Sequence, residues 1–202
     1  MWSARTAFAL GIVLVAVACR QTAPAKEGDT SDDQTGDRTG AYADIVIDYA
    51  PVILGEEPTE PHRGGDNALE APDYAGVNSC SSMGTCTFVS LGDGGSITLG
   101  FLDHLIVASG DAAPDLRIYE VGPDIEDTFV EISGDNATWL SVGAVFGSTA
   151  TIDIDAYGPE SGSTFVYVRL TDDSSQGRQS KGTVGADIDA VEALSFVATQ
   201  DG

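Results

Sequence analysis

Basic residues are scarce in this chain, and that scarcity limits what it can bind. The sequence holds nine Lys and Arg residues against 32 Asp and Glu residues, giving a formal net charge of −23. A field of this sign repels nucleic acid and anionic lipid headgroups, so neither is expected as a direct partner. Divalent cations are suitable counterions, although an acidic surface that only maintains solubility is the more common case.

Recognisable catalytic motifs are also absent. The only histidines are His62 and His104, and neither has a nucleophile or metal ligand beside it in the sequence. The chain contains no Gly-x-Ser-x-Gly elbow, no His-Glu-x-x-His motif and no phosphate-binding loop. Paired carboxylates can hydrolyse glycosides, but among 32 acidic residues some pair can always be found. We therefore expect a protein that is not an enzyme, with a carboxylate-based hydrolase as an alternative.

No hydrophobic run is long enough to serve as a permanent membrane span. The apolar stretch Ala7–Ala18 follows a short positive segment and has about a dozen residues, whereas a spanning helix needs roughly 20. Residues 1–18 therefore have the form of a signal peptide. The sequence Ala16-Val17-Ala18-Cys19 resembles the bacterial lipobox, which implies a covalent diacylglycerol on Cys19. The alternative is an ordinary secretory leader in which Cys19 has no role.

Residues 19–40 lack any large aliphatic or aromatic side chain. Such a segment cannot bury enough apolar surface to offset its ordering entropy, so it is expected to be a lipidated flexible tether. A lipid-anchored protein of the cell envelope, with the membrane as partner, follows from this arrangement. Arg20 stands where an Asp retains many Gram-negative lipoproteins in the inner membrane, so an outer-membrane location is expected if the host is Gram-negative.

Cysteine is limited to three residues. If Cys19 carries lipid, Cys80 and Cys86 remain as an even pair, and in an oxidising compartment such a pair is expected to form a disulfide. A metal-binding pair is less favoured because no His or further Cys lies nearby in the sequence. A redox pair is less favoured because the spacing is not Cys-x-x-Cys.

Residues 41–202 show no sustained helical periodicity and are expected to form one domain. Short runs with alternating apolar and polar residues predict half-buried strands, and strands without intervening helices favour an all-β, two-sheet antiparallel sandwich of the jelly-roll type. The expected strands are residues 44–49, 87–91, 96–101, 105–108, 115–121, 128–133, 139–145, 149–153, 165–172 and 190–197. The Pro-, Gly- and acid-rich segment 55–78 is expected to be a long loop.

Five segments occur in an order that we recognise: residues 89–101, 114–120, 130–139, 167–172 and 185–191. They resemble bacterial extracellular and cell-surface β-sandwich domains in which the patterns SLGxGGxITLGF, GxDLxVFE, VEVSxDGxxW, YVRIxD and GFDLDAV recur. The resemblance covers about residues 42–198. It implies a fold and a cell-surface location, and no single activity defines the family. Two positions depart from the patterns, namely the turn Gly134-Asp135-Asn136 and Ala186.

The candidate metal ligands in these segments are carboxylates, which offer only oxygen atoms. Calcium takes six to eight oxygen ligands in irregular geometry, so carboxylates from separate strand ends could form a structural site. Asp187 and Asp189, two residues apart on a strand, would share one face and repel each other without a cation. The alternative is that these groups accept hydrogen bonds from backbone amides in turns. The expected calcium ligands are Asp115, Glu120, Asp172, Asp187 and Asp189, with Glu131 and Asp173 also in the acidic segments.

Four aromatic residues could stack on sugar rings at the domain surface, or could belong to the core: Trp139, Tyr157, Phe165 and Tyr167. Together these features predict a membrane-tethered surface lipoprotein with a non-enzymatic β-sandwich for ligand binding or adhesion. Its expected partner is a glycan or an envelope protein, and calcium is an expected stabiliser. The rival hypothesis is a structural or assembly component of the envelope that has no small ligand.

Overall fold

The computed structural model describes residues 41–51, 57–76, 80, 86–121, 126–176, 179–180 and 182–199. All of them belong to the unit Arg38–Gly202. The predicted signal peptide, Cys19 and the predicted tether lie outside the described residues. Within the described part of the chain, no helix is long and apolar enough to cross a membrane.

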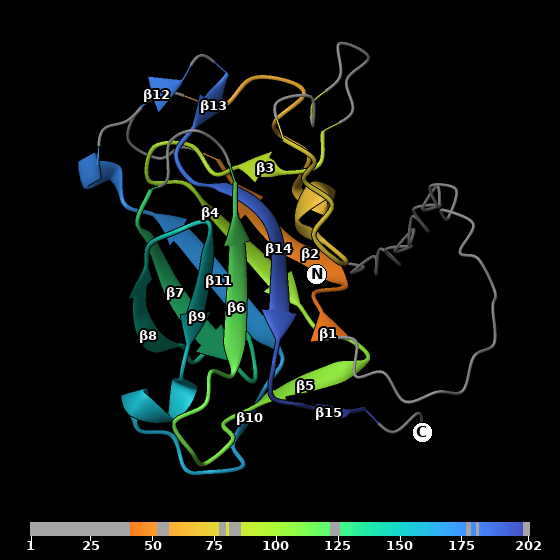
Figure 1. Cartoon of the computed structure of the whole chain (residues 1–202), viewed down its shortest axis with the longest axis vertical. Helices are drawn as coiled ribbons and strands as arrows, with labels where there is room; N and C mark the ends of the chain where they lie inside the picture. Colours follow the sequence, from red (N-terminus) through yellow and green to blue (C-terminus); the bar gives the residue numbers. More distant parts are fainter. Residues whose placement is uncertain are drawn as a thin grey trace, which may run out of the picture. The chain divides into compact units, whose positions relative to one another are not determined.

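The domain is an antiparallel β-sandwich, as the alternating sequence pattern predicted. Its first sheet has the strand order β1 (Ala41–Tyr42), β14 (Asp187–Ala193), β6 (Leu116–Glu120) and β9 (Thr149–Ile152), and β3 (Val89–Ser90) also pairs with β14. The second sheet has the order β2 (Ile45–Ala50), β4 (Ser96–Gly100), β11 (Tyr167–Asp172), β7 (Thr128–Ser133) and β8 (Leu140–Val145). Figure 1 shows the two sheets as separate layers.

Two smaller sheets complete the fold. One contains β10 (Thr164–Phe165), β5 (His104–Val107) and β15 (Phe196–Ala198), and the other pairs β12 (Gln179–Ser180) with β13 (Thr183–Val184). Among the described residues, three short 3-10 helices occur at η1 (Gly65–Ala68), η2 (Ile154–Tyr157) and η3 (Ser174–Gln176). The loop predicted at 55–78 therefore contains one 3-10 turn and no strand among its described residues.

The core lies between the two large sheets. It is formed by the apolar side chains that alternate with polar ones along their strands. In β11, Val168 and Leu170 are fully buried while their neighbours are half-buried, and in β6, Leu116 and Ile118 are buried while Arg117 and Tyr119 are not. Residues of one parity thus face the core and those of the other parity face outward. Every residue of β14 is buried, because η1 packs against this strand in addition to the sheet. The sandwich therefore presents an outer sheet face on which β6 and its neighbours display polar side chains.

The predicted strands are confirmed to within a few residues, with two differences. The stretch 165–172 divides into β10 and β11 at Val166, and the stretch 190–197 divides into β14 and β15. β14 also begins earlier than predicted, at Asp187. Three two-residue strands, β1, β12 and β13, were not predicted, since two residues are too few to show alternation.

Candidate functional site

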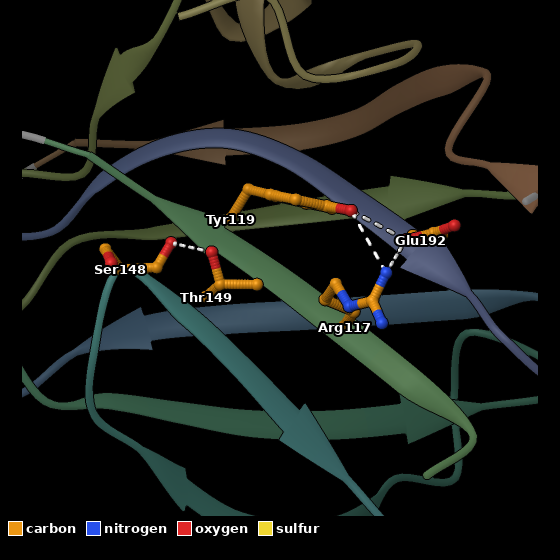
Figure 2. A network of polar contacts seen from close by, with 5 residues as sticks. All are labelled: Arg117, Tyr119, Ser148, Thr149 and Glu192. Carbon is orange, nitrogen blue, oxygen red and sulfur yellow. Dashed lines mark hydrogen bonds and ion pairs between the residues drawn. The ribbon is translucent and has the colours of Figure 1, made fainter. Parts of the chain in front are cut away.

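A polar network lies on the outer face of the first sheet. Arg117 and Glu192 are register partners on β6 and β14, and Arg117 Nη1 lies 2.9 Å from Glu192 Oε2. The Tyr119 hydroxyl donates to the same Oε2 at 2.8 Å and accepts from Arg117 Nη1 at 3.3 Å. Figure 2 shows these three side chains meeting above the sheet. The Tyr119 hydroxyl both donates and accepts in this network, which orients its side chain.

Beside this network is a hollow of about 410 Å³, which we call the tyrosine–carboxylate pocket. Tyr119 forms one wall, and Thr149, its register partner on β9, lies next to it. The Thr149 hydroxyl donates to the Ser148 carbonyl at 2.9 Å, an interaction visible in Figure 2. The lining residues are Pro72, Tyr74, Tyr119, Glu120, Val121, Ser148, Thr149 and Asp189.

Asp189 connects the sheet to the loop that carries Tyr74. It occupies an irregularity of the β14–β6 register between Ile188 and Ala190. Its two carboxylate oxygens accept the backbone N–H groups of Asp73 and Tyr74, each at 3.3 Å. Burial raises the pKa of Asp189 to about 6, although these two hydrogen bonds act in the opposite direction. Asp189 thus holds the Tyr74 backbone at the pocket. Burial of the Asp189 carboxylate away from water makes its charged form less favourable.

Glu120 is the second carboxyl group of the pocket. It is only 2% exposed and accepts the Glu126 backbone N–H at 2.8 Å. Burial raises its pKa to about 8, and the negative charges of Glu126 and Asp187 raise it further. Glu120 is therefore mostly protonated at neutral pH. A protonated carboxyl group can both donate and accept hydrogen bonds.

The pocket combines aromatic ring surface with hydrogen-bonding groups. Two tyrosine side chains offer apolar ring surface, while the Thr149 hydroxyl and the carboxyl groups of Glu120 and Asp189 offer directed hydrogen bonds. A mostly apolar hollow with a few fixed polar groups is the usual form of a small-ligand site. The sequence singled out Glu120 and Asp189 as calcium ligands and missed Tyr74. Nothing local indicates that Tyr74 would meet a residue 115 positions away.

The five predicted calcium ligands do not converge on one point. Asp172 accepts the backbone N–H groups of Gly94 at 2.9 Å and Ala186 at 2.8 Å, and burial raises its pKa. Asp187 accepts a short hydrogen bond from the Ser90 hydroxyl. The backbone-amide alternative thus describes Asp172, Asp189 and Glu120.

Asp115 is the predicted ligand that has acidic neighbours. It is fully buried and accepts the backbone N–H groups of Ser109 at 3.2 Å and Ile154 at 2.9 Å. Carboxylate oxygens of Asp115, Asp153 and Asp155 lie within 4.8 Å of one another. The buried Asp153 Oδ1 has no hydrogen-bond partner. The sequence analysis did not name Asp153 or Asp155.

The other two acidic residues named from the sequence lie elsewhere. Glu131 forms an ion pair with Arg169 on the second sheet, with Oε2 and Nη2 2.6 Å apart. The Asp173 side chain accepts the backbone N–H of Ser175 at 3.0 Å. Neither residue lines the tyrosine–carboxylate pocket.

The Cys80–Cys86 disulfide is present, as predicted. His62 lies against it, with Nδ1 3.4 Å from each sulfur. Burial lowers the pKa of His62. The His62 ring also contacts Phe88 at 5.4 Å, and Phe88 contacts Tyr74 edge-on at 6.0 Å. The disulfide region therefore supports the loop that carries Tyr74. The contacts that connect them, through His62 and Phe88, could not be predicted from the sequence.

The four aromatic residues considered for sugar stacking lie outside the buried core. Tyr157 is 44% exposed, and Trp139, Phe165 and Tyr167 are half-buried. Trp139 immediately precedes β8 rather than lying within it. Trp139 and Phe165 line a second hollow on the other sheet.

Comparisons of this chain with known proteins find similarity to solved structures, and none to a family model or a curated protein. No family model matches the chain, and no curated protein matches it. The C-terminal domain of a chitobiase from Bacteroides fragilis aligns with 14% identity and a TM-score of 0.36, over 52% of this chain and 64% of that one. The matched part is thus less than two thirds of that domain. CpGH89CBM32-6 from Clostridium perfringens aligns with 13% identity and a TM-score of 0.35, over 54% of this chain and 74% of that one.

Proposed function

We propose that this chain is a lipid-anchored, non-enzymatic module of the cell envelope that binds a glycan in the tyrosine–carboxylate pocket. Diacylglycerol on Cys19 attaches the mature chain, residues 19–202, to the membrane. Residues 20–40 separate the domain from the bilayer by about 25 Å on average, from roughly 5–6 Å times the square root of the residue number. The domain then meets its ligand away from the lipid surface.

The composition of the pocket carries this proposal. A pyranose ring has apolar C–H faces and an edge of hydroxyl groups, and Tyr74 and Tyr119 supply ring surface beside hydroxyl and carboxyl groups. Tyrosine suits such contacts because its ring is apolar and its hydroxyl can form a hydrogen bond. The net charge of −23 opposes the binding of sulfated or uronic-acid glycans. Neutral or amino sugars are the class that fits.

A glycan array probed with the soluble Cys19→Ser form of the mature chain tests the proposal against its rivals. Reproducible binding to one class of neutral or amino sugar supports it. No sugar binding, together with an envelope protein that co-purifies stoichiometrically, supports the structural or assembly alternative. Release of reducing sugar that Glu120→Gln abolishes would support the hydrolase alternative.

Tyr74→Ala is expected to weaken binding of the best array ligand about tenfold, because loss of one aromatic contact costs on the order of 1.4 kcal/mol. Isothermal titration calorimetry gives the two dissociation constants. Tyr157→Ala is the matched control, since Tyr157 is an exposed tyrosine that does not line the pocket. Equal affinities for all three proteins would place the glycan elsewhere.

We also propose a structural calcium ion, held by the carboxylates of Asp115, Asp153 and Asp155. The unpartnered Oδ1 of Asp153 supports this placement, since a buried carboxylate oxygen is costly without a proton, donor or cation. Calcium at 100 times its dissociation constant adds about 2.7 kcal/mol to the free energy of unfolding. For a domain of this size the melting temperature should rise by roughly 5–10 °C.

Melting curves in calcium and in chelator, at constant ionic strength, measure this effect. Asp153→Asn should abolish the calcium-dependent shift, and Asp189→Asn should retain it. The reverse result would move the ion to the pair Asp187 and Asp189. Identical melting temperatures in calcium and chelator would show that no stabilising calcium binds.

A further inference from the structure

A second hollow lies on the other sheet of the sandwich. Its volume is about 430 Å³, and we call it the Trp139 hollow. Ile132 of β7 and Leu140 of β8 line it, together with Gly134, Asp135 and Thr138 of the connecting turn, which we call its rim. Trp139 and Phe165 of β10 contribute its two aromatic side chains. The tyrosine–carboxylate pocket instead belongs to β6, β9 and β14, so the two hollows are separate sites.

The indole of Trp139 is held in place from one side. The Arg169 guanidinium carbon lies 4.1 Å from the centre of the Trp139 ring system, a favourable cation–π distance. Arg169 is itself fixed by its register partner Glu131, with Nε 2.8 Å and Nη2 2.6 Å from Glu131 Oε2. Arg169 does not line the hollow. The Trp139 side chain thus packs against Arg169 and also contributes to the lining of the hollow.

The rim turn is also rigid. Asp135 accepts the backbone N–H groups of Ala137 at 2.9 Å and Thr138 at 2.7 Å. The Ser133 hydroxyl accepts the N–H groups of Asp135 at 3.2 Å and Asn136 at 3.0 Å. A site formed in advance loses little conformational entropy when it binds. The backbone hydrogen bonds also lower the pKa of Asp135, so the rim carries a negative charge.

These features select one class of occupant. Two aromatic and two aliphatic side chains in the lining suit the C–H face of a sugar ring. The Thr138 hydroxyl, which donates to Asp135 Oδ2 at 3.3 Å, can accept a hydrogen bond from a ring hydroxyl. The ionised Asp135 and the net charge of −23 oppose an anionic ligand. We propose that the Trp139 hollow is a second glycan site that takes a neutral pyranose ring, and that one molecule can hold two glycan chains on its two sheets.

This inference rests on the proposed glycan-binding function, but it concerns a different set of residues. Two sites on one molecule raise its apparent affinity for a polymer surface without strengthening either site, because the second contact becomes intramolecular. They also allow the protein to bridge two polysaccharide strands. Either property suits a surface protein that adheres to a polymer.

The sequence provides a selective probe of this hollow. The chain has two tryptophans, Trp2 and Trp139, and only Trp139 belongs to residues 19–202. Titration of the soluble Cys19→Ser mature chain with neutral hexasaccharides of β-1,4-glucose, β-1,3-glucose and β-1,4-N-acetylglucosamine should shift Trp139 emission to the blue and reduce quenching by acrylamide. The same change should appear in Tyr74→Ala, in which the first site is impaired. Calorimetry should give two sites in the parent protein and one in Trp139→Ala.

The outcomes separate this inference from the proposed function. Calorimetric binding of one hexasaccharide per chain, with unchanged Trp139 emission, would overturn the second site and leave the first. Absence of binding in both experiments would overturn both proposals. Trp139→Phe retains an aromatic ring, so it should keep two sites and a parent-like melting temperature. Loss of the second site in Trp139→Phe as well as Trp139→Ala, with both variants folded, would contradict stacking as its basis.

Discussion

Cys19→Ala is expected to release the protein from the membrane completely. The mature chain, residues 19–202, contains no long apolar run, so the lipid is its sole expected means of attachment. Two or more acyl chains anchor a protein firmly because each buried methylene contributes about 0.8 kcal/mol. Fractionation of cells expressing each form, followed by immunoblotting, measures the distribution.

Metabolic labelling with an alkyne-bearing palmitate identifies the lipid directly. The parent protein should carry the label, and Cys19→Ala should not. The double variant Cys80→Ala/Cys86→Ala is the control, because it removes the two other thiols and should remain labelled and membrane-bound. Equal labelling of Cys19→Ala would refute the lipobox interpretation.

The free energy of unfolding is expected to fall by several kcal/mol as the pH rises from about 5 to about 9, on the order of 1.4 kcal/mol for each unit of pKa shift. Burial raises the pKa of Asp189 to about 6 and that of Glu120 to about 8, from ordinary values of 3.8 and 4.5. The folded protein therefore binds more protons than the unfolded chain in this range. The stabilisation is complete below the ordinary values and is lost as the pH passes each raised value.

Variants divide this decline into its two parts. Glu120→Gln should remove the part of the decline that extends from pH 4.5 to about 8, while Asp189→Asn should remove the part from pH 3.8 to about 6. Urea unfolding at each pH provides the free energies. His62, whose pKa burial lowers, contributes with the opposite sign, and Asp172, whose pKa burial raises, contributes with the same sign. Both are present in every protein, so they cancel in the difference from the parent. A Glu120→Gln protein with the full parental decline would show that Glu120 is ionised in the folded state at neutral pH.

The sequence was most informative about the strands. In β6 and β11 the side chains that alternate in burial also alternate in polarity, so both the strands and their inward faces could be predicted. The break at Val166 could not, because continuous apolar sequence runs through it. The break between β14 and β15 could not either, because Ser195 is the one polar residue in the stretch 193–197. Which strands pair is a non-local property, and the order β1-β14-β6-β9 joins segments from both ends of the domain.

The candidate site was predictable only in part. Glu120 and Asp189 were identified from their acidic segments, and both line the pocket. Their neighbours were not, because Tyr74 and His62 lie in the Pro- and Gly-rich segment, where no periodicity indicates what a side chain will contact. The placement of Tyr74 depends on Asp189, and that of His62 depends on the disulfide. These contacts exist only once the sandwich has formed.

The rigidity of the Tyr119 wall has a functional consequence for the pocket. Arg117, Tyr119 and Glu192 are hydrogen-bonded to one another across β6 and β14, and Asp189 accepts the backbone N–H of Tyr74. Both aromatic walls are thus set before a ligand arrives. Affinity in such a site comes from contacts that need little rearrangement.

The most direct test of glycan binding in the tyrosine–carboxylate pocket is a map of amide chemical shifts. The isotope-labelled, soluble mature chain would be titrated with its best sugar from the glycan array. We expect saturable shifts at Tyr74, Tyr119 and Thr149 that follow the dissociation constant of the site that Tyr74→Ala weakens, separate from any shifts at the Trp139 hollow. Shifts that leave these three amides unchanged while the sugar saturates its site would contradict binding in this pocket.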